Sequence, residues 1–319
     1  MPSSTETIKI KTGNQGAPST AGERKKAVAQ MLIAAALWST GGIFIKLIPW
    51  NPFAIAGIRS LIAAVAVFAY IKKTGVRFQL SKKAAQSGLF MSGVFFFFVI
   101  ANKLTTAANA IVLQFTSPVF ILILGALFFH QKCKKGDIIT VIITLGGISL
   151  FFFDQLTPGN LLGNCFGIVA GLMVACTYLV VGEVDEDTRM SGVFLGQIFT
   201  AIIGTPFVFF TDAPVTAVSV TAIIALGIIQ LGVPYVMFAL SIKHCSALAC
   251  NLIGAIEPLL NPVWVFLFAG ERPGFFALIG AGVVLIAITA WCMWNEKSQR
   301  RQERELGVQA RALENGIQP

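Results

Sequence analysis

Long apolar runs separated by short polar connections dominate this chain and constrain its fold more than any other feature. Hydrophobic residues make up 55% of its 319 positions and charged residues only 12%, whereas roughly 25% of residues are charged in soluble domains. A soluble protein of this length could not bury so much apolar surface, so part of the chain must face lipid. Lipid offers the backbone no hydrogen bonds and the runs do not alternate in polarity, so we predict an all-α membrane protein.

The apolar runs between residues 27 and 294 have room for ten transmembrane helices, at roughly 20 apolar residues per crossing. We expect polar tails at 1–26 and 295–319, and connections too short to hold a separate domain. The predicted helices cover residues 27–48, 52–71, 86–104, 107–129, 137–153, 161–182, 192–211, 218–240, 247–269 and 275–294.

The distribution of lysine and arginine predicts the orientation of these helices. With the N-terminus in the cytoplasm, twenty of the 24 basic residues fall in cytoplasmic loops or tails, and only Lys46, Lys103 and Arg272 fall outside. Cytoplasmic loops of membrane proteins carry an excess of basic residues. We therefore expect both termini in the cytoplasm of an integral multi-pass protein, in the plasma (inner) membrane.

The sequence lacks the features that are typical of several other classes of protein. The net charge of +9 is spread over short loops, so we expect no nucleic-acid partner. The six cysteines form no CxxC pair and the two histidines fall in loops, so we expect neither a metal site nor another cofactor. Without a histidine in any predicted span, an intramembrane enzyme is disfavoured. The chain also has no phosphate-binding loop with which to use ATP.

An internal repeat relates the two halves of the apolar region. Pro118 and Pro258 each interrupt a predicted helix, and each is followed thirteen residues later by a polar residue, Gln131 or Glu271. Residues 27–153 and 161–294 then correspond as two sets of five helices. An odd number of helices inverts the second set, as in many secondary transporters. The alternative is that apolar helices align with one another trivially.

The chain also resembles a known family. The run Ala36-Leu37-Trp38-Ser39-Thr40-Gly41, followed by Lys46, Pro52 and Arg59, is similar to the first half of an EamA domain of the drug/metabolite transporter superfamily. The stretch from Pro258 to Glu271 is similar to the signature of its second half. This resemblance implies two inverted five-helix repeats, alternating access, and export or exchange of small metabolites such as amino acids. Gln131 departs from the family pattern, which usually has a glutamate there.

Two charged residues fall deep inside predicted helices, where a charge costs at least about 2.5–3.5 kcal/mol. Glu257 lies near the middle of the ninth helix, where it could bind an amino group or take up a coupling proton. Arg59, in the second helix, could hold a carboxylate or phosphate. The alternatives are a glutamate that only joins helices and an arginine that reaches the membrane surface. Lys46 and Lys103 are expected to be anchors at the outer membrane surface.

Uncharged polar and aromatic residues in the same helices complete the predicted site. We expect a cavity between the fourth and ninth helices, lined in part by aromatic side chains. Each of these residues could instead serve interhelical packing. The candidates, besides Glu257 and Arg59, are Trp38, Gln114, Ser117, Tyr178, Gln197, Tyr235, Asn251 and Asn261.

The sequence thus predicts a secondary transporter with alternating access around a cavity near the bilayer midplane. Its expected partners are a small-molecule substrate, a coupling proton and the lipid bilayer, and the interpretation allows a homodimer. A zwitterionic amino acid would suit both Arg59 and Glu257. A phosphorylated sugar or an organic cation would suit only one of them, and a bundle that transports nothing would need neither.

Overall fold

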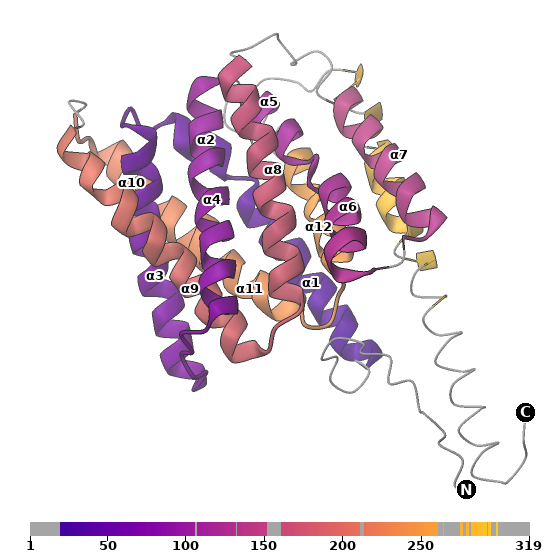
Figure 1. The fold of residues 1–319 in the computed structure, drawn as a ribbon. Coiled ribbons are helices and arrows are strands. Elements are labelled where there is room, and N and C mark those ends of the chain that lie inside the picture. Colours follow the sequence, from indigo (N-terminus) through magenta and orange to yellow (C-terminus); the bar gives the residue numbers. More distant parts are fainter. Residues whose placement is uncertain are drawn as a thin grey trace, which may run out of the picture.

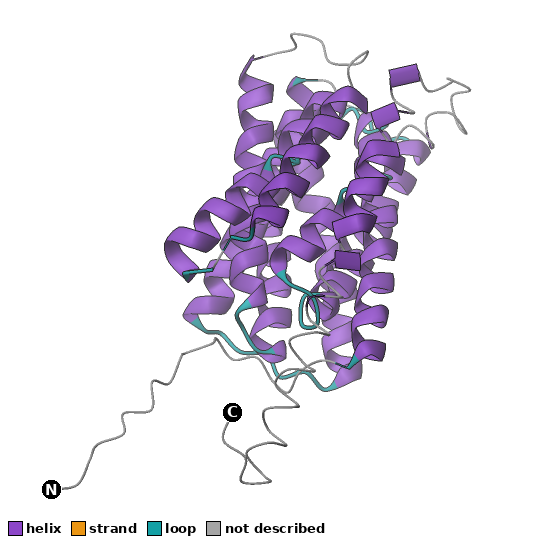
Figure 2. Cartoon of the chain, turned by 90° about the vertical axis from the view of Figure 1, so that its right-hand side faces the viewer, coloured by secondary structure: helices purple, strands orange, loops and turns teal. Residues whose placement is uncertain are grey.

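The protein is an α-helical bundle in a computed structural model that describes residues 20–105, 107–131, 133–151, 161–210 and 214–260, and short pieces between 264 and 298. Figures 1 and 2 show the helices packed along one another with loops at both ends. The helices before residue 160 are α1 (Ala21–Trp38), α2 (Gly41–Lys46), α3 (Pro52–Thr74), α4 (Lys82–Leu104), α5 (Ala107–Gln114), α6 (Ser117–Phe129) and α7 (Lys135–Phe151). After it come α8 (Leu161–Gly182), α9 (Glu186–Gly204), the 3₁₀ helix η1 (Thr205–Phe210), α10 (Ala217–Ala225), the π-helix η2 (Leu226–Gly232), α11 (Val233–Ser241) and α12 (Ala247–Gly254).

Seven segments of the described chain are long and apolar enough to cross a membrane. They are Ala21–Lys46, Pro52–Thr74, Lys82–Leu104, Asn109–Phe129, Leu161–Gly182, Glu186–Phe210 and Ala217–Ser241. The predicted fifth, ninth and tenth crossings coincide with α7 and with the shorter apolar helices Ala247–Leu260 and Gly282–Trp291. The all-helical membrane fold is therefore confirmed, whereas the count of ten helices remains a prediction.

Several of the predicted helices are interrupted rather than continuous. The predicted helix 27–48 divides into α1 and α2, and 107–129 divides into α5 and α6 around Phe115 and Thr116. The predicted helix 218–240 has the π-turn η2 in its centre. The i→i−4 ladder is broken before Pro118 and Pro234 because proline has no backbone N–H and crowds the preceding turn.

Several helices begin earlier than their apolar runs predict because a polar residue caps them. Thr20 and Glu23 form a capping box, so α1 starts at Ala21 rather than at the predicted residue 27. The Oγ of Ser81 accepts from the N–H of Ala84 at the start of α4. Asp185 caps α9 by accepting from the N–H of Thr188 at 2.9 Å, a bond that lowers the pKa of its carboxyl group.

Helices from the two parts of the chain approach so closely that only glycine fits between them. A Cβ on Gly57 of α3 would lie 2.2 Å from the backbone nitrogen of Thr205, and one on Gly204 would lie 2.5 Å from the carbonyl oxygen of Phe53. In the same way α4 packs against α8 and α9 beside glycines such as Gly163 and Gly196. Small residues at such crossings let membrane helices pack backbone to backbone.

At one end of the bundle, the loop 75–81 is fastened to the start of α9. The backbone N–H of Arg77 donates to Oδ1 of Asp187 at 3.0 Å, and the N–H of Gln79 donates to Oγ of Ser191 at 2.9 Å. The loop 242–246 joins this end through an ion pair of 3.0 Å between Lys243 and Glu186. Loops that the sequence assigns to one membrane face thus meet at one end.

Two lysines hold the opposite end of the bundle. Nζ of Lys46, at the end of α2, donates to the carbonyl oxygen of Asn102 at 2.6 Å. Nζ of Lys103, near the end of α4, donates to the carbonyl oxygen of Ile48, also at 2.6 Å. Cations near helix C-termini satisfy carbonyl groups that have no intrahelical partner. These lysines therefore join α2 to α4, a structural role in addition to any contact with the membrane surface.

The close approach of α3 and α9 generates a stability prediction. Gly57→Ala places a methyl group against the backbone of α9, so we expect the free energy of unfolding to fall by about 1–3 kcal/mol. Gly146→Ala in α7 is the matched control, since a Cβ there meets no atom within 4 Å. Thermal unfolding in detergent, followed by tryptophan fluorescence, measures both. Equal midpoints for the two variants would show that this crossing is not tightly packed.

Candidate functional site

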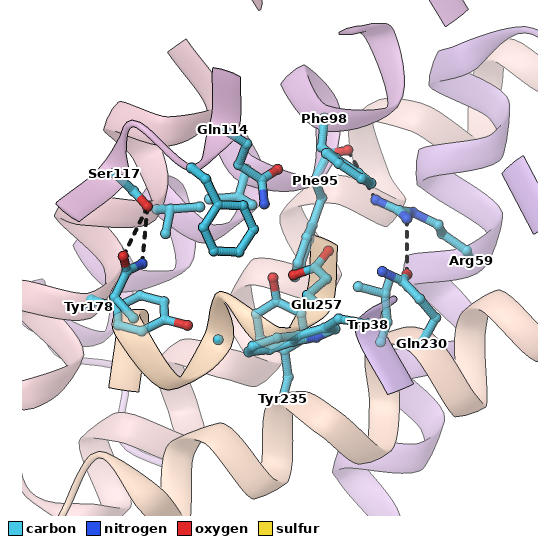
Figure 3. A pocket seen from close by; sticks show the side chains of 16 residues that line it. Trp38, Arg59, Phe95, Phe98, Gln114, Ser117, Tyr178, Gln230, Tyr235 and Glu257 are labelled. Carbon is cyan, nitrogen blue, oxygen red and sulfur yellow. Dashed lines mark hydrogen bonds between the residues drawn. The ribbon is translucent and has the colours of Figure 1, made fainter. Parts of the chain in front are cut away.

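A small cavity lies in the centre of the bundle, where helices from both parts of the chain meet (Figure 3). It encloses about 50 Å³, space for a few water molecules but far below the roughly 300–1,000 Å³ of typical ligand pockets. The residues that line it are Trp38, Arg59, Val94, Phe95, Phe98, Gln114, Phe115, Ser117, Val174, Tyr178, Gln230, Leu231, Tyr235, Asn251, Gly254 and Glu257.

Two buried apolar clusters adjoin the cavity and share residues with its wall. One includes Met31, Leu179 and Ile242, and extends toward the loops 75–81 and 242–246. The other includes Ile45 and Leu226, and extends toward the lysine-joined end of α2 and α4. Phe95 and Tyr178 of the cavity wall belong to the first cluster, and Phe98 and Phe115 belong to the second.

Interrupted helices supply much of the cavity wall. The helix breaks at Phe115 and at Ala255 each lie three residues before a proline, Pro118 or Pro258. A hydrogen bond joins the two interrupted helices: Oγ of Ser117 in α6 accepts from Nδ2 of Asn251 in α12 at 3.0 Å. Broken helices inside a membrane are tolerated where the freed backbone groups are buried in protein or line a cavity. The predicted kinks thus fall at corresponding places, one on each side of the cavity.

Arg59 extends from α3 into the cavity wall and is held by neutral groups alone. Its Nη1 donates to Oε1 of Gln230 and its Nη2 to the carbonyl oxygen of Phe95, both at 3.1 Å. Nε, also buried, has no hydrogen-bond partner. The side chain is 1% exposed, and within the described chain no carboxylate forms an ion pair with it. The site therefore holds a buried positive charge that no acid of the described residues neutralises.

Glu257 lines the same cavity from the helix that follows Ala255, near Trp38 and Tyr235 (Figure 3). It is 7% exposed, and among the described residues it forms neither a hydrogen bond nor an ion pair. Its side chain faces the cavity rather than lipid. Although Arg59 and Glu257 line one cavity, they do not form an ion pair with each other.

Aromatic side chains form the apolar part of the wall. The rings of Trp38 and Tyr235 meet edge to face with centroids 5.2 Å apart, and Phe95 meets Tyr235 in the same way at 4.9 Å. Nε1 of Trp38 and Oε1 of Gln114 are buried without a hydrogen-bond partner. Among the described residues, these atoms are thus an unused donor and an unused acceptor in the cavity wall, besides the two charged side chains.

Most of the site residues expected from the sequence come together here. Gln197 does not line the cavity: it is buried in α9, and neither its Oε1 nor its Nε2 has a hydrogen-bond partner. Asn261 lies outside the described residues. Eight of the ten candidates line it, namely Trp38, Arg59, Gln114, Ser117, Tyr178, Tyr235, Asn251 and Glu257.

Sequence reasoning missed Gln230, the residue that positions Arg59. It lies in the π-turn η2 of the span Ala217–Ser241, and such turns occur frequently at functional sites. Its side chain also passes so close to Gly41 that a Cβ there would lie 2.9 Å from Nε2. A usable signal was present, because Gln230 is an isolated polar residue in the apolar run Leu226-Gly-Ile-Ile-Gln-Leu-Gly232, before Pro234.

Comparison with known proteins identifies the family. The model of the EamA-like transporter family matches residues 25–153 and again 161–291. The chain belongs to this family. An uncharacterized transporter of Archaeoglobus fulgidus is 27% identical over 273 residues, which cover 79% of this chain and 91% of that protein. The uncharacterized transporter YxxF of Bacillus subtilis is 25% identical over 271 residues, covering 81% and 86% of the two chains.

A solved crystal structure shares the fold of this EamA-family chain. It superposes with a TM-score of 0.70 and 15% sequence identity, covering 86% of this chain and 98% of that one. Together with the seven apolar spans, the family assignment identifies an integral multi-pass membrane protein of the drug/metabolite transporter type. Its substrate class is small molecules.

The hydrogen bond from Arg59 to Gln230 generates the second prediction. Gln230→Leu leaves the Nη1 group of Arg59 buried without its acceptor, so we expect the free energy of unfolding to fall by about 1–3 kcal/mol. Gln197→Leu is the matched control. It removes a buried amide that has no partner, so stability should stay the same or rise. Thermal unfolding in detergent distinguishes the two, and equal losses would contradict the assigned role of Gln230.

Proposed function

We propose that this EamA-family transporter moves a zwitterionic metabolite, with an amino acid as the simplest example, by alternating access. The observation that carries the proposal is the pair of charges, Arg59 and Glu257, that line one buried cavity and form no ion pair with any described residue. A buried charge without a counterion is costly. A solute with a carboxylate and an ammonium group would supply both counterions, whereas water supplies neither.

The small volume of the cavity supports the alternating-access part of the proposal. At about 50 Å³ the cavity is too small for such a solute, so substrate must enter a more open conformation. We assign the two apolar clusters as the gates, since one extends from the cavity wall toward each end of the bundle. Opening one while the other stays packed would expose Arg59 and Glu257 to one membrane face at a time.

The corresponding breaks before Pro118 and Pro258 support a pair of five-helix repeats related by inversion. Under this proposal, residues 27–153 and 161–294 each contribute one broken helix and one charge to the site. Arg59 binds the carboxylate and is kept in place by Gln230. Glu257 binds the ammonium group, or in the empty carrier takes up the coupling proton that drives export or exchange.

A phosphorylated sugar would depend mainly on Arg59, and an organic cation mainly on Glu257. Counterflow into proteoliposomes with a panel of amino acids, sugar phosphates and organic cations ranks the three classes. We expect amino-acid counterflow to fall at least about tenfold in Arg59→Gln, as for the loss of a charged hydrogen bond. A panel on which no solute moves, with correctly folded protein, would contradict the transporter proposal.

Coupling requires its own measurement. In Glu257→Gln we expect accumulation driven by a pH gradient to disappear, because the side chain can no longer carry a proton. Glu183→Gln is the control, since Glu183 is an exposed loop carboxylate. Uptake with and without an imposed pH gradient compares the variants. Wild-type accumulation and pH dependence in Glu257→Gln would refute the coupling role.

We further propose that the loops 75–81 and 242–246 and both termini face the cytoplasm, with the protein in the plasma (inner) membrane. The cluster of basic residues in these loops and tails supports this orientation. A fluorescent protein fused to the C-terminus should then fold and fluoresce, whereas an alkaline phosphatase fusion at the same site should be inactive. An active phosphatase fusion would reverse the orientation.

A further inference from the structure

A second hollow, which we call the basic groove, lies on the outer surface at the end of the bundle that carries the loop 75–81. It encloses about 260 Å³ and opens between α3, this loop and α9. No part of the central cavity contributes to it. The residues that line it are Phe68, Ile71, Lys72, Val76, Phe78 and Phe194.

The walls of the basic groove are apolar and remain exposed. The rings of Phe68 and Phe78 each lie with their centroid 5.9 Å from that of Phe194, yet Phe68 is 48% and Phe78 50% exposed. In a membrane protein such rings contact lipid. An aromatic-lined hollow on this surface is shaped to receive an acyl chain.

Lys72 is the charged residue of the groove lining, and the acidic Asp187 of α9 contacts the same loop through the backbone N–H of Arg77. Five basic residues occur between positions 72 and 83, and no acidic residue occurs between Glu23 and Asp137 in the sequence. Nζ of Lys72 lies 5.5 Å from the ring centroid of Phe68, directly beside the apolar wall. Within the described chain none of the five takes part in an ion pair.

The loop that forms one wall is held in place by its backbone. The N–H groups of Arg77 and Gln79 donate to Asp187 and Ser191 of α9, so Phe78 between them is fixed against Phe194 while its outer face stays uncovered. The groove therefore persists without an occupant and bridges α3 to α9.

We propose that the basic groove binds one anionic phospholipid, with an acyl chain between Phe68, Phe78 and Phe194 and its phosphate beside Lys72. Apolar walls alone would accept any lipid. The cations without acidic partners select a headgroup with net negative charge, as basic pockets at membrane surfaces do. Since the occupant contacts α3, the loop and α9 together, it would also stabilise this end of the bundle.

Native mass spectrometry of the detergent-purified full chain tests the proposal, with phosphatidylglycerol and phosphatidylcholine of identical acyl chains as probes. We expect one phosphatidylglycerol to be retained in preference to phosphatidylcholine. Lys72→Gln should weaken that binding about fivefold, the effect of one cation near an anionic headgroup. Lys73→Gln is the matched control, because it removes the same charge from a neighbouring exposed residue that does not line the groove.

The apolar wall is tested separately by Phe78→Ser, which should weaken retention of phosphatidylglycerol without changing the charge. The midpoint of thermal unfolding with added phosphatidylglycerol gives a second readout. We expect this midpoint to rise in the wild type and to rise less in Lys72→Gln. Equal retention of both lipids would overturn the proposal, as would equal weakening by Lys72→Gln and Lys73→Gln. The same stabilisation by inorganic phosphate alone would also overturn it, since the groove would then be irrelevant.

Discussion

Every backbone amide inside a lipid bilayer must find its hydrogen-bond partner within the protein, and the arrangement of this bundle depends on that requirement. Intact helices meet it unaided, so α3, α4 and α8 run without interruption. The interrupted helices can exist only where neighbours shield the freed groups. The breaks at Phe115 and Ala255 and the π-turn η2 accordingly surround the central cavity. The positions at which the backbone departs from regular helix are thus the positions at which polar side chains can be presented to a solute.

The two buried charges follow a related rule. The Nη groups of Arg59 donate to the side-chain amide of Gln230 and the carbonyl oxygen of Phe95. These neutral acceptors orient the guanidinium group but do not neutralise its charge. Glu257 has no partner in the described chain. If the two formed an ion pair, the empty protein would be more stable and a zwitterion would have to break that pair in order to bind. Keeping them apart leaves each available to a ligand, at a cost in stability that the extensive apolar packing around the cavity offsets.

The sequence predicts most of the fold, because a long run of apolar residues is a strong indication of a membrane helix. The predictions that were wrong concern local features of single helices. Helix starts at Ala21 and Glu186 depend on caps supplied by Thr20 and Asp185, which hydropathy ignores. Gln197 was chosen by matching positions between the two repeats, which assumes that equivalent residues face the same cavity. The structure instead places Gln230, in the π-turn η2 of another helix, beside Arg59. Polar residues judged by depth alone, such as Glu257 and Asn251, do line the cavity.

The packing also indicates which helices can move during transport. Where α3 meets α9, and α4 meets α8 and α9, glycines bring the backbones into contact, and sliding one such helix past another would drive backbone into backbone. Close-packed contacts of this kind have few intermediate positions. The interrupted helices differ, since the turns near Ser39, Phe115 and Ala255 lack a continuous hydrogen-bond ladder. Bending there costs fewer hydrogen bonds than bending α3 or α4. For the proposed alternating access, we therefore expect α3, α4, α8 and α9 to form the static frame, while segments hinged at the breaks move to open one apolar cluster or the other.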